Sequence, residues 1–305
     1  MRKVTVYSME VCTSCERVKN MLDAREIPYE EVVMAPDSPA LDELSAELAA
    51  FFGVDLDRSH DHESLLTGAL KTEAVVLRSM RFGEADRILH LYTPHRGRAS
   101  AIAKGVRRAR SRFGGRLEPY FRLHLVLFEG RSELLTVTSA QTISGHPRLR
   151  EHAAALDSAA RACDAVSRLF ATPDPHPGVF ALLCNELALL DADPTQATHA
   201  NQLAFRLKLL LAAGLAPQLA ACAACGEGDH LSAFSGAAGG VVCSACEASG
   251  FALGEEAHAF MTGALGSPLA EAPSVGALAL RQADRAISET LEYHANVRLR
   301  PAIPG

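Results

Sequence analysis

The chain has 305 residues, of which 48% are hydrophobic and 22% are charged, which is enough for two or three domains with cores of their own. This composition excludes a disordered or fibrous protein. No stretch approaches 18 consecutive apolar residues, and residues 1–9 lack the apolar run of a signal peptide. We therefore expect a cytoplasmic protein.

Charge is unevenly distributed along the chain, although the net charge is only −6. Residues 30–63 contain ten acidic residues and a single basic residue, Arg58. Residues 71–122 contain thirteen Lys and Arg against four acidic residues. A basic segment of this size favours a polyanionic partner, which the overall isoelectric point conceals.

The first 70 residues predict a small α/β unit followed by an acidic linker. Residues 1–34 contain a strand at 4–7, a helix at 15–24 and a strand at 29–34, which make one βαβ unit. We expect this unit to be too small to fold alone. Residues 35–70 contain a helix rich in Ala, Leu and Glu, and then a polar stretch typical of a linker.

Residues 71–145 predict short strands separated by turns that contain glycine or proline. The strands are expected at 75–77, 88–92, 99–103, 121–128 and 134–138. Strands at this spacing suggest a small closed barrel or a sandwich.

Residues 146–305 predict mainly helices. Apolar periodicity places these helices at 148–170, 179–190, 195–213 and 275–296. A cysteine-rich stretch, residues 219–250, lies before the last of them. We therefore expect a helical domain with a cysteine-rich module inserted in it.

Four cysteines in this module follow the pattern C-x2-C-x17-C-x2-C, namely Cys222, Cys225, Cys243 and Cys246. Two C-x2-C turns can direct four thiolates at one point, which is the tetrahedral arrangement that zinc prefers. The spacing predicts one structural Zn2+ with no open coordination position. The alternatives are two unrelated pairs of buried cysteines, or His230 in place of one ligand.

Eight cations and no acidic residue lie between residues 96 and 116. These cations are Arg96, Arg98, Lys104, Arg107, Arg108, Arg110, Arg112 and Arg116. Most of them fall between the third and fourth predicted strands, so we expect a loop that projects from the barrel and binds DNA phosphates. Four nearby aromatic residues are candidates for stacking on unpaired bases, namely Phe82, Tyr92, Phe113 and Tyr120. The alternatives are a solvated loop and aromatic residues that belong to the core.

Several motifs, in this order along the chain, resemble the RecO family of DNA repair proteins. The motifs are residues 72–78 (TEAVVLR), 82–89 (FGEADRIL), 104–108 (KGVRR), 111–119 (SRFGGRLEP), 222–226 (CAACG), 243–246 (CSAC) and 291–294 (LEYH). The resemblance covers about residues 71–302.

This resemblance implies an α+β multidomain fold, with an OB-fold barrel, a helical domain and an inserted zinc ribbon. It implies a non-enzymatic recombination mediator that binds single- and double-stranded DNA and anneals complementary strands. Such proteins act with RecR to help RecA replace the single-stranded-DNA-binding protein at the bacterial nucleoid, and they bind the acidic tail of that protein. Arg206 and Lys208 are candidates for the tail site, and the alternative for both is a solvated helix face.

Residues 3–34, with Cys12-Thr-Ser-Cys15, resemble the first thioredoxin-like βαβ unit of glutaredoxins. A C-x2-C motif at the start of a helix favours attack on disulfides, because the helix end lowers the pKa of the first thiol. Residues 53–64 offer no counterpart of the hairpin that completes a glutaredoxin. The segment is therefore a vestigial fusion, the product of a misassigned start codon, or a redox or metal-binding appendage.

Two further functions stay open. One is a thiol-disulfide oxidoreductase that uses Cys12 and Cys15 and carries a DNA-targeting C-terminal part. The other is a zinc-ribbon interaction protein without direct DNA contact. The sequence contains no P-loop, H-E-x-x-H or G-x-S-x-G motif, so it does not support a nucleotide-driven motor or a common hydrolase.

Overall fold

The computed structural model describes residues 4–8, 29–33, 69–108, 110–130 and 134–302. The chain forms two compact units, Met1–Arg58 and Ser59–Gly305. In the first unit, β1 (Val4–Ser8) and β2 (Tyr29–Val33) pair in parallel. A parallel pair requires a crossover connection, as in the expected βαβ unit. The predicted helix at 15–24, Cys12, Cys15 and the acidic stretch up to residue 63 lie outside the described residues, apart from residues 30–33.

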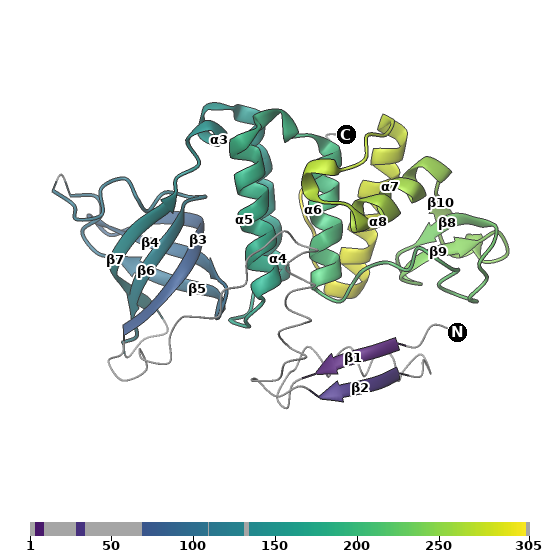
Figure 1. The fold of residues 1–305 in the computed structure, drawn as a ribbon, viewed down its shortest axis with the longest axis horizontal. Helices are drawn as coiled ribbons and strands as arrows, with labels where there is room; N and C mark the ends of the chain where they lie inside the picture. Colours follow the sequence, from purple (N-terminus) through teal and green to yellow (C-terminus); the bar gives the residue numbers. More distant parts are fainter. Residues whose placement is uncertain (1–3, 9–28, 34–68, 109, 131–133, 303–305) are drawn as a thin grey trace. The chain divides into compact units, whose positions relative to one another are not determined.

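The second unit begins with a closed β-barrel. Its strands are β3 (Ala69–Phe82), β4 (Asp86–Thr93), β5 (Gly97–Ala103), β6 (Arg122–Phe128) and β7 (Leu135–Ser144). They follow the order β3-β4-β5-β7-β6 around the barrel, and β3 also pairs with β6 (Figure 1). The pairing of β5 with β7 is parallel, and the other pairings are antiparallel. This is the expected five-stranded Greek-key barrel of an OB fold.

Alternating residues of the strands fill the barrel. Leu89 and Leu91 of β4 are fully buried there, as are Leu123 and Leu127 of β6. The connection between β5 and β6 also contributes to this core. The barrel interior is therefore a packed core and not a cavity.

The helical part follows the barrel. Its main helices are α3 (Pro147–Glu151), α4 (Ala153–Leu169), α5 (Pro177–Ala192), α6 (His199–Ala212), α7 (Glu255–Gly266) and α8 (Ala277–Ala295). Residues 201–210 of α6 are all buried, so this helix lies at the centre of the helical core. The predicted helix at 148–170 is two helices, because His152 adopts an extended conformation. None of the helices that the structure describes is long and apolar enough to cross a lipid bilayer.

The barrel packs directly on the helical core. Val75, Leu77 and Tyr92 belong to the core formed by the helices, and the Tyr92 ring lies edge-on to Phe170 with the ring centroids 6.4 Å apart. Gly97 marks a second close contact, because a Cβ atom there would lie 2.0 Å from the carbonyl oxygen of Asp174. The turn between β4 and β5 therefore rests on the connection between α4 and α5.

A small antiparallel sheet lies between α6 and α7 in the sequence. It consists of β8 (Leu231–Ser235), β9 (Gly240–Cys243) and β10 (Phe251–Ala252), in the order β10-β8-β9 (Figure 1). Phe234 and Val241 join the helical core, and the His294 ring of α8 lies 2.7 Å from the Gly236 carbonyl oxygen. This sheet is the expected ribbon.

Candidate nucleic-acid interface and metal centre

The basic connection between β5 and β6 is held against the barrel and does not project from it as expected. Phe113 and Leu117 are 2% and 1% exposed and belong to the barrel core. The backbone N–H of Arg107 donates to the Ala85 carbonyl oxygen at 2.9 Å, so the connection also contacts the turn between β3 and β4. The prediction of a projecting loop is wrong, because the apolar side chains of Phe113 and Leu117 lie within the basic run and anchor its backbone to the barrel.

The cations of this connection remain exposed. They are Lys104, Arg107, Arg108, Arg110, Arg112 and Arg116, and we call them the basic connection cations. Among the described residues, no carboxylate forms an ion pair with any of them, and Arg107, Arg112 and Arg116 donate only to backbone carbonyl oxygens. Arg96 differs, because its guanidinium lies 3.2 Å from a Glu129 carboxylate oxygen. Arg98 is half-buried on β5.

Two of the four expected stacking residues are unavailable to bases. Tyr92 and Phe113 are 0% and 2% exposed, so both are core residues. Tyr120 is half-buried, and its carbonyl oxygen lies 2.8 Å from Nδ1 of His146. Phe82 is 50% exposed and precedes Gly83, whose carbonyl oxygen accepts a 3.4 Å hydrogen bond from Arg107. Phe82 therefore lies close to the basic connection cations.

The outer face of the barrel carries a further cation that was not predicted from the sequence. Arg78 of β3 is exposed and lies opposite His90 of β4, which in turn lies opposite Ser100 of β5. Burial lowers the pKa of His90, and the positive charges of Arg98 and Arg78 lower it further. The lowered pKa favours the neutral form of His90, so the positive charge of this face comes from Arg78 on β3 and Arg98 on β5. The register shift between Val76 and Arg78 turns Arg78 to this face, whereas strict alternation from the buried Ala74 and Val76 would have placed it in the core.

The four cysteines of the ribbon come together as expected. Their Sγ atoms all lie within 4.8 Å of one another, and this is the only such group of His, Cys, Asp or Glu among the described residues. The Sγ atoms of Cys225 and Cys243 are 3.7 Å apart. A zinc tetrahedron with Zn–S bonds of about 2.3 Å requires S–S distances of about 3.8 Å. His230 is outside this group, so the cluster could hold a metal ion on cysteines alone.

Backbone geometry supports the two C-x2-C turns. Gly226 has φ +81°, a conformation that favours glycine, and its N–H donates to the Cys222 carbonyl oxygen at 2.8 Å. The Cys246 N–H donates to the Cys243 carbonyl oxygen at 2.9 Å. Each turn therefore carries its pair of cysteines on a hydrogen-bonded loop.

The thiols influence one another's ionisation. Burial acts to raise the pKa of Cys222, but a set of hydrogen bonds led by the backbone of Cys243 and Cys225 outweighs it and lowers the pKa to about 6. Hydrogen bonding to Cys243, and then to Cys225, raises the pKa of Cys246 to about 12. One thiolate thus forms easily and its neighbour stays protonated. A bound cation would remove this difference, because all coordinating thiols lose their protons.

Known proteins share this order of parts. A family model described as recombination protein O N terminal matches residues 68–146, and one described as recombination protein O C terminal matches residues 150–301. The DNA repair protein RecO of Anaeromyxobacter dehalogenans (strain 2CP-C) is 36% identical over 239 residues, which cover 75% of this chain and 93% of that protein. The chain belongs to the RecO family of DNA repair proteins.

Other RecO proteins give the same result. The DNA repair protein RecO of Rubrobacter xylanophilus is 40% identical over 182 residues, covering 58% of this chain and 71% of that protein. The DNA repair protein RecO of Bifidobacterium adolescentis is 40% identical over 183 residues, covering 57% and 72%. The resemblance seen in the sequence is confirmed, and it places the chain in DNA repair and recombination.

The N-terminal unit matches a different family. The family model described as glutaredoxin matches residues 4–55. This match confirms the glutaredoxin resemblance and extends it beyond residue 34. Cys12 and Cys15 lie within the matched range, outside the described residues.

The helical cations proposed for an acidic tail are not on the surface. Arg206 and Lys208 are 4% and 3% exposed, so neither an exposed binding site nor a solvated helix face describes them. Arg206 forms a 3.1 Å ion pair with Asp284 of α8, and Nζ of Lys208 donates to the Leu265 carbonyl oxygen at 3.4 Å. Both side chains join elements of the helical core.

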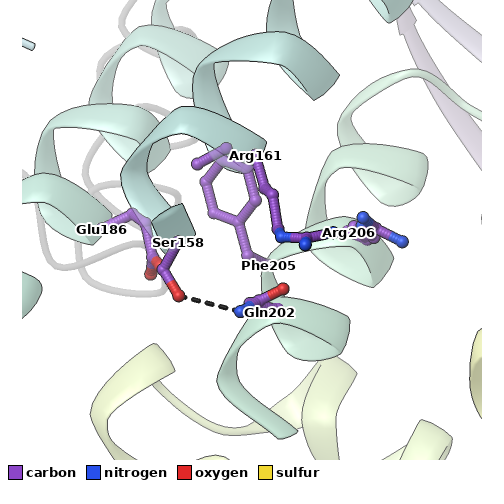
Figure 2. Close-up of a pocket in the computed structure, with 7 residues that line it drawn as sticks. Ser158, Arg161, Glu186, Gln202, Phe205 and Arg206 are labelled. Atoms are coloured by element: carbon purple, nitrogen blue, oxygen red, sulfur yellow. Dashed lines mark hydrogen bonds between the residues drawn. The ribbon is translucent and has the colours of Figure 1, made fainter. Parts of the chain in front are cut away.

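A small polar cavity lies beside Arg206. Its volume is about 10 Å3, and Ser158, Glu186, Gln202 and Arg161 also line it (Figure 2). Nε2 of Gln202 donates to Oγ of Ser158 at 2.9 Å. The cavity has room for about one water molecule and is too small for an organic ligand.

Proposed function

We propose that this chain is a non-enzymatic recombination mediator that binds DNA on the basic side of its barrel. It anneals complementary strands and, with RecR, helps load RecA onto single-stranded DNA coated by the single-stranded-DNA-binding protein. The observation that carries the proposal is a set of exposed cations, without carboxylate partners among the described residues, held on an OB barrel. The proposed site of action is the nucleoid, in the cytoplasm.

The proposed DNA contacts are the basic connection cations together with Arg98 and Arg78, while Arg96 contributes less because of its ion pair with Glu129. OB folds bind oligonucleotides on the face of their second and third strands and on the loop between the first two. Those features correspond to β4, β5 and the turn after Phe82. Phe82 supplies the stacking surface.

Charge reversal of Arg107, Arg108 and Arg110 to Glu tests this interface. Six phosphate contacts to single-stranded DNA give a slope of about −4 for log Kobs against log salt concentration. The triple variant is expected to bind an oligonucleotide more weakly, with a slope flatter by about 2. Fluorescence anisotropy at several salt concentrations measures both quantities.

The matched control reverses three exposed cations of the helical part, Arg168, Arg281 and Arg298, to Glu. It changes the net charge equally and should leave the slope near that of the parent chain. If the connection variant binds as the parent does, or if both variants lose affinity equally, the interface lies elsewhere.

Annealing of complementary oligonucleotides coated with single-stranded-DNA-binding protein tests the mediator role. The parent chain is expected to accelerate duplex formation, and the connection variant is expected to lose this effect together with DNA binding. A parent chain that binds DNA but does not accelerate annealing would contradict the mediator role and leave the interface intact.

We also propose that the four cysteines hold one structural Zn2+. The support is that the four sulfurs lie within 4.8 Å of one another, with the Cys225 and Cys243 sulfurs 3.7 Å apart, close to the separation that a zinc tetrahedron requires. Four cysteine ligands leave no open coordination position for a substrate, which is typical of a structural site. Elemental analysis is expected to find one zinc per chain. Zinc added to the metal-free chain at neutral pH should release protons, since the raised pKa of Cys225 and Cys246 keeps those thiols protonated without metal.

The glutaredoxin match favours a second candidate function, thiol-disulfide exchange by Cys12 and Cys15. A glutathione-linked disulfide assay tests it. Turnover that Cys12→Ser abolishes would support an oxidoreductase, and absence of turnover in the parent chain would reject it.

A further inference from the structure

The four ribbon cysteines differ in their exposure to solvent. Cys222 and Cys243 are 3% and 4% exposed, whereas Cys225 is exposed and Cys246 is half-buried. The sulfur of Cys225 also lies only 3.7 Å from that of the buried Cys243. The most exposed of the four cysteines therefore has its sulfur in van der Waals contact with the sulfur of a buried one.

We infer that the ribbon is a site of oxidative modification, at which a hydroperoxide joins Cys225 to Cys243 in a disulfide and zinc is released. The inference rests on the proposed zinc site. Metal-bound cysteines are thiolates, and the thiolate is the form that peroxides oxidise. Exposure then selects Cys225 as the first cysteine to react with the peroxide.

The chemistry balances with hydrogen peroxide as the oxidant. The Cys225 thiolate attacks one peroxide oxygen, the O–O bond breaks, and a sulfenic acid and a hydroxide form. The Cys243 thiolate then attacks the Cys225 sulfur, the S–O bond breaks, and a second hydroxide leaves. The two hydroxides take up two protons from solvent, so the sulfurs lose two electrons and the peroxide gains them.

Loss of the metal should loosen the two C-x2-C turns and leave the rest of the ribbon in place. The core around the cysteines is small, since Ala233 and Val242 are the only fully apolar buried side chains in it among the described residues. The opposite side of the ribbon is anchored independently, because Phe234 and Val241 are buried in the helical core. The modification therefore changes the tip of the ribbon and not the helical fold.

The test uses the full chain, loaded with zinc, with Cys12→Ser and Cys15→Ser to remove the other C-x2-C pair. A chromophoric chelator follows zinc release after hydrogen peroxide is added. One zinc per chain is expected to be released, with far-UV circular dichroism largely unchanged. Peptide mapping should find Cys225 in the new disulfide, with Cys163 and Cys184 reduced because both are buried in helices.

The discriminating variant is Cys225→His, made in the same background. Imidazole is a zinc ligand but cannot form a disulfide, so this variant should keep its zinc in peroxide. Zinc that stays bound in the Cys225 chain, or a disulfide that leaves Cys225 reduced, overturns the inference. A chain that contains no zinc before oxidation fails the zinc proposal instead, so the two failures are distinguishable.

Discussion

Glu186 of α5 is a carboxyl group buried in the helical core, with 1% of its surface exposed. Burial raises its pKa to about 8, although a hydrogen bond with Asn201 acts in the opposite direction. Among the described residues, no partner bonds to its Oε2 atom, and the Oε1 atom of the adjacent Gln202 also lacks one. A water molecule in the cavity of Figure 2 would satisfy both oxygens.

This raised pKa predicts a stability that falls as pH rises. Between the ordinary value of 4.5 and about 8, the folded chain keeps the Glu186 proton and the unfolded chain has lost it. The free energy of unfolding therefore declines by ~1.4 kcal/mol per pH unit in this window from this group. Glu186→Gln, which stays neutral, should remove that contribution and be more stable than the parent near pH 8.

Urea unfolding of both chains at pH 5, 6.5 and 8 measures the difference. The control is Glu151→Gln, because Glu151 is exposed on α3, and this variant should follow the parent at each pH. A Glu186→Gln difference that is constant with pH would show that the carboxyl group is not protonated in the folded chain.

Single residues also show what sequence spacing can and cannot predict. The four cysteines could be identified because their ligand role depends on spacing, which the sequence displays directly. The role of the aromatic residues could not be predicted in this way. Tyr92 and Phe113 are close to cations in the sequence, but the Tyr92 ring lies in the helical core and the Phe113 ring lies in the barrel core. The burial of Arg206 and Lys208 depends on Asp284 and Leu265, which are distant in the sequence.

At the scale of elements, the barrel and helical part are joined by a turn that admits no side chain. Gly97 and Gly83 have similar φ values of +56° and +54°, but a Cβ atom meets Asp174 only at Gly97. Gly83→Ala should cost ~1–2 kcal/mol for its left-handed backbone. Gly97→Ala should cost a further ~1–3 kcal/mol for overpacking.

Equilibrium unfolding of the two variants measures the contribution of the contact between Gly97 and Asp174. The cost of a left-handed backbone is common to both variants, so the difference between their free energies of unfolding comes from this contact. Equal losses of stability would mean that the turn between β4 and β5 can move away from the connection between α4 and α5 without cost.

The barrel strands and four of the longer helices follow from periodicity, but the strands of the ribbon and α7 were not predicted. Its buried residues, Ala257, Phe260, Met261 and Ala264, do have helical spacing, and Glu255 and Glu256 occupy its first turn. Only two of these four residues are large, and the nearby cysteine motif drew attention away from the pattern. The same limitation applied to the basic connection, where two apolar residues among many cations decide the packing.

At the scale of the whole molecule, the two compact units allow the two candidate functions to be separated. A chain that begins at Ser59 keeps the unit that holds the barrel, helices and ribbon. We expect it to bind and anneal DNA as the full chain does, and to lack any thiol-disulfide exchange. Oligonucleotide annealing and a glutathione-linked assay, run on both chains, measure these outcomes.

Annealing lost on removal of residues 1–58 would show that the glutaredoxin-like segment takes part in the DNA function.

The order of the domains could be predicted from the sequence because each part has its own periodicity or spacing. The contacts between the domains could not be predicted. They depend on residues that are distant in the sequence, such as Gly97 and Asp174, and no sequence motif marks them.

Strand β3 has consequences for how this protein can be divided or recombined. Ala74 and Val76 point into the barrel core, whereas Val75 and Leu77 belong to the core of the helices. A barrel excised after Ser144 would expose Val75, Leu77 and Tyr92 to water, so it should aggregate. The barrel is therefore not a transplantable module, and a chimera that borrows it must bring α4 and α5 as well.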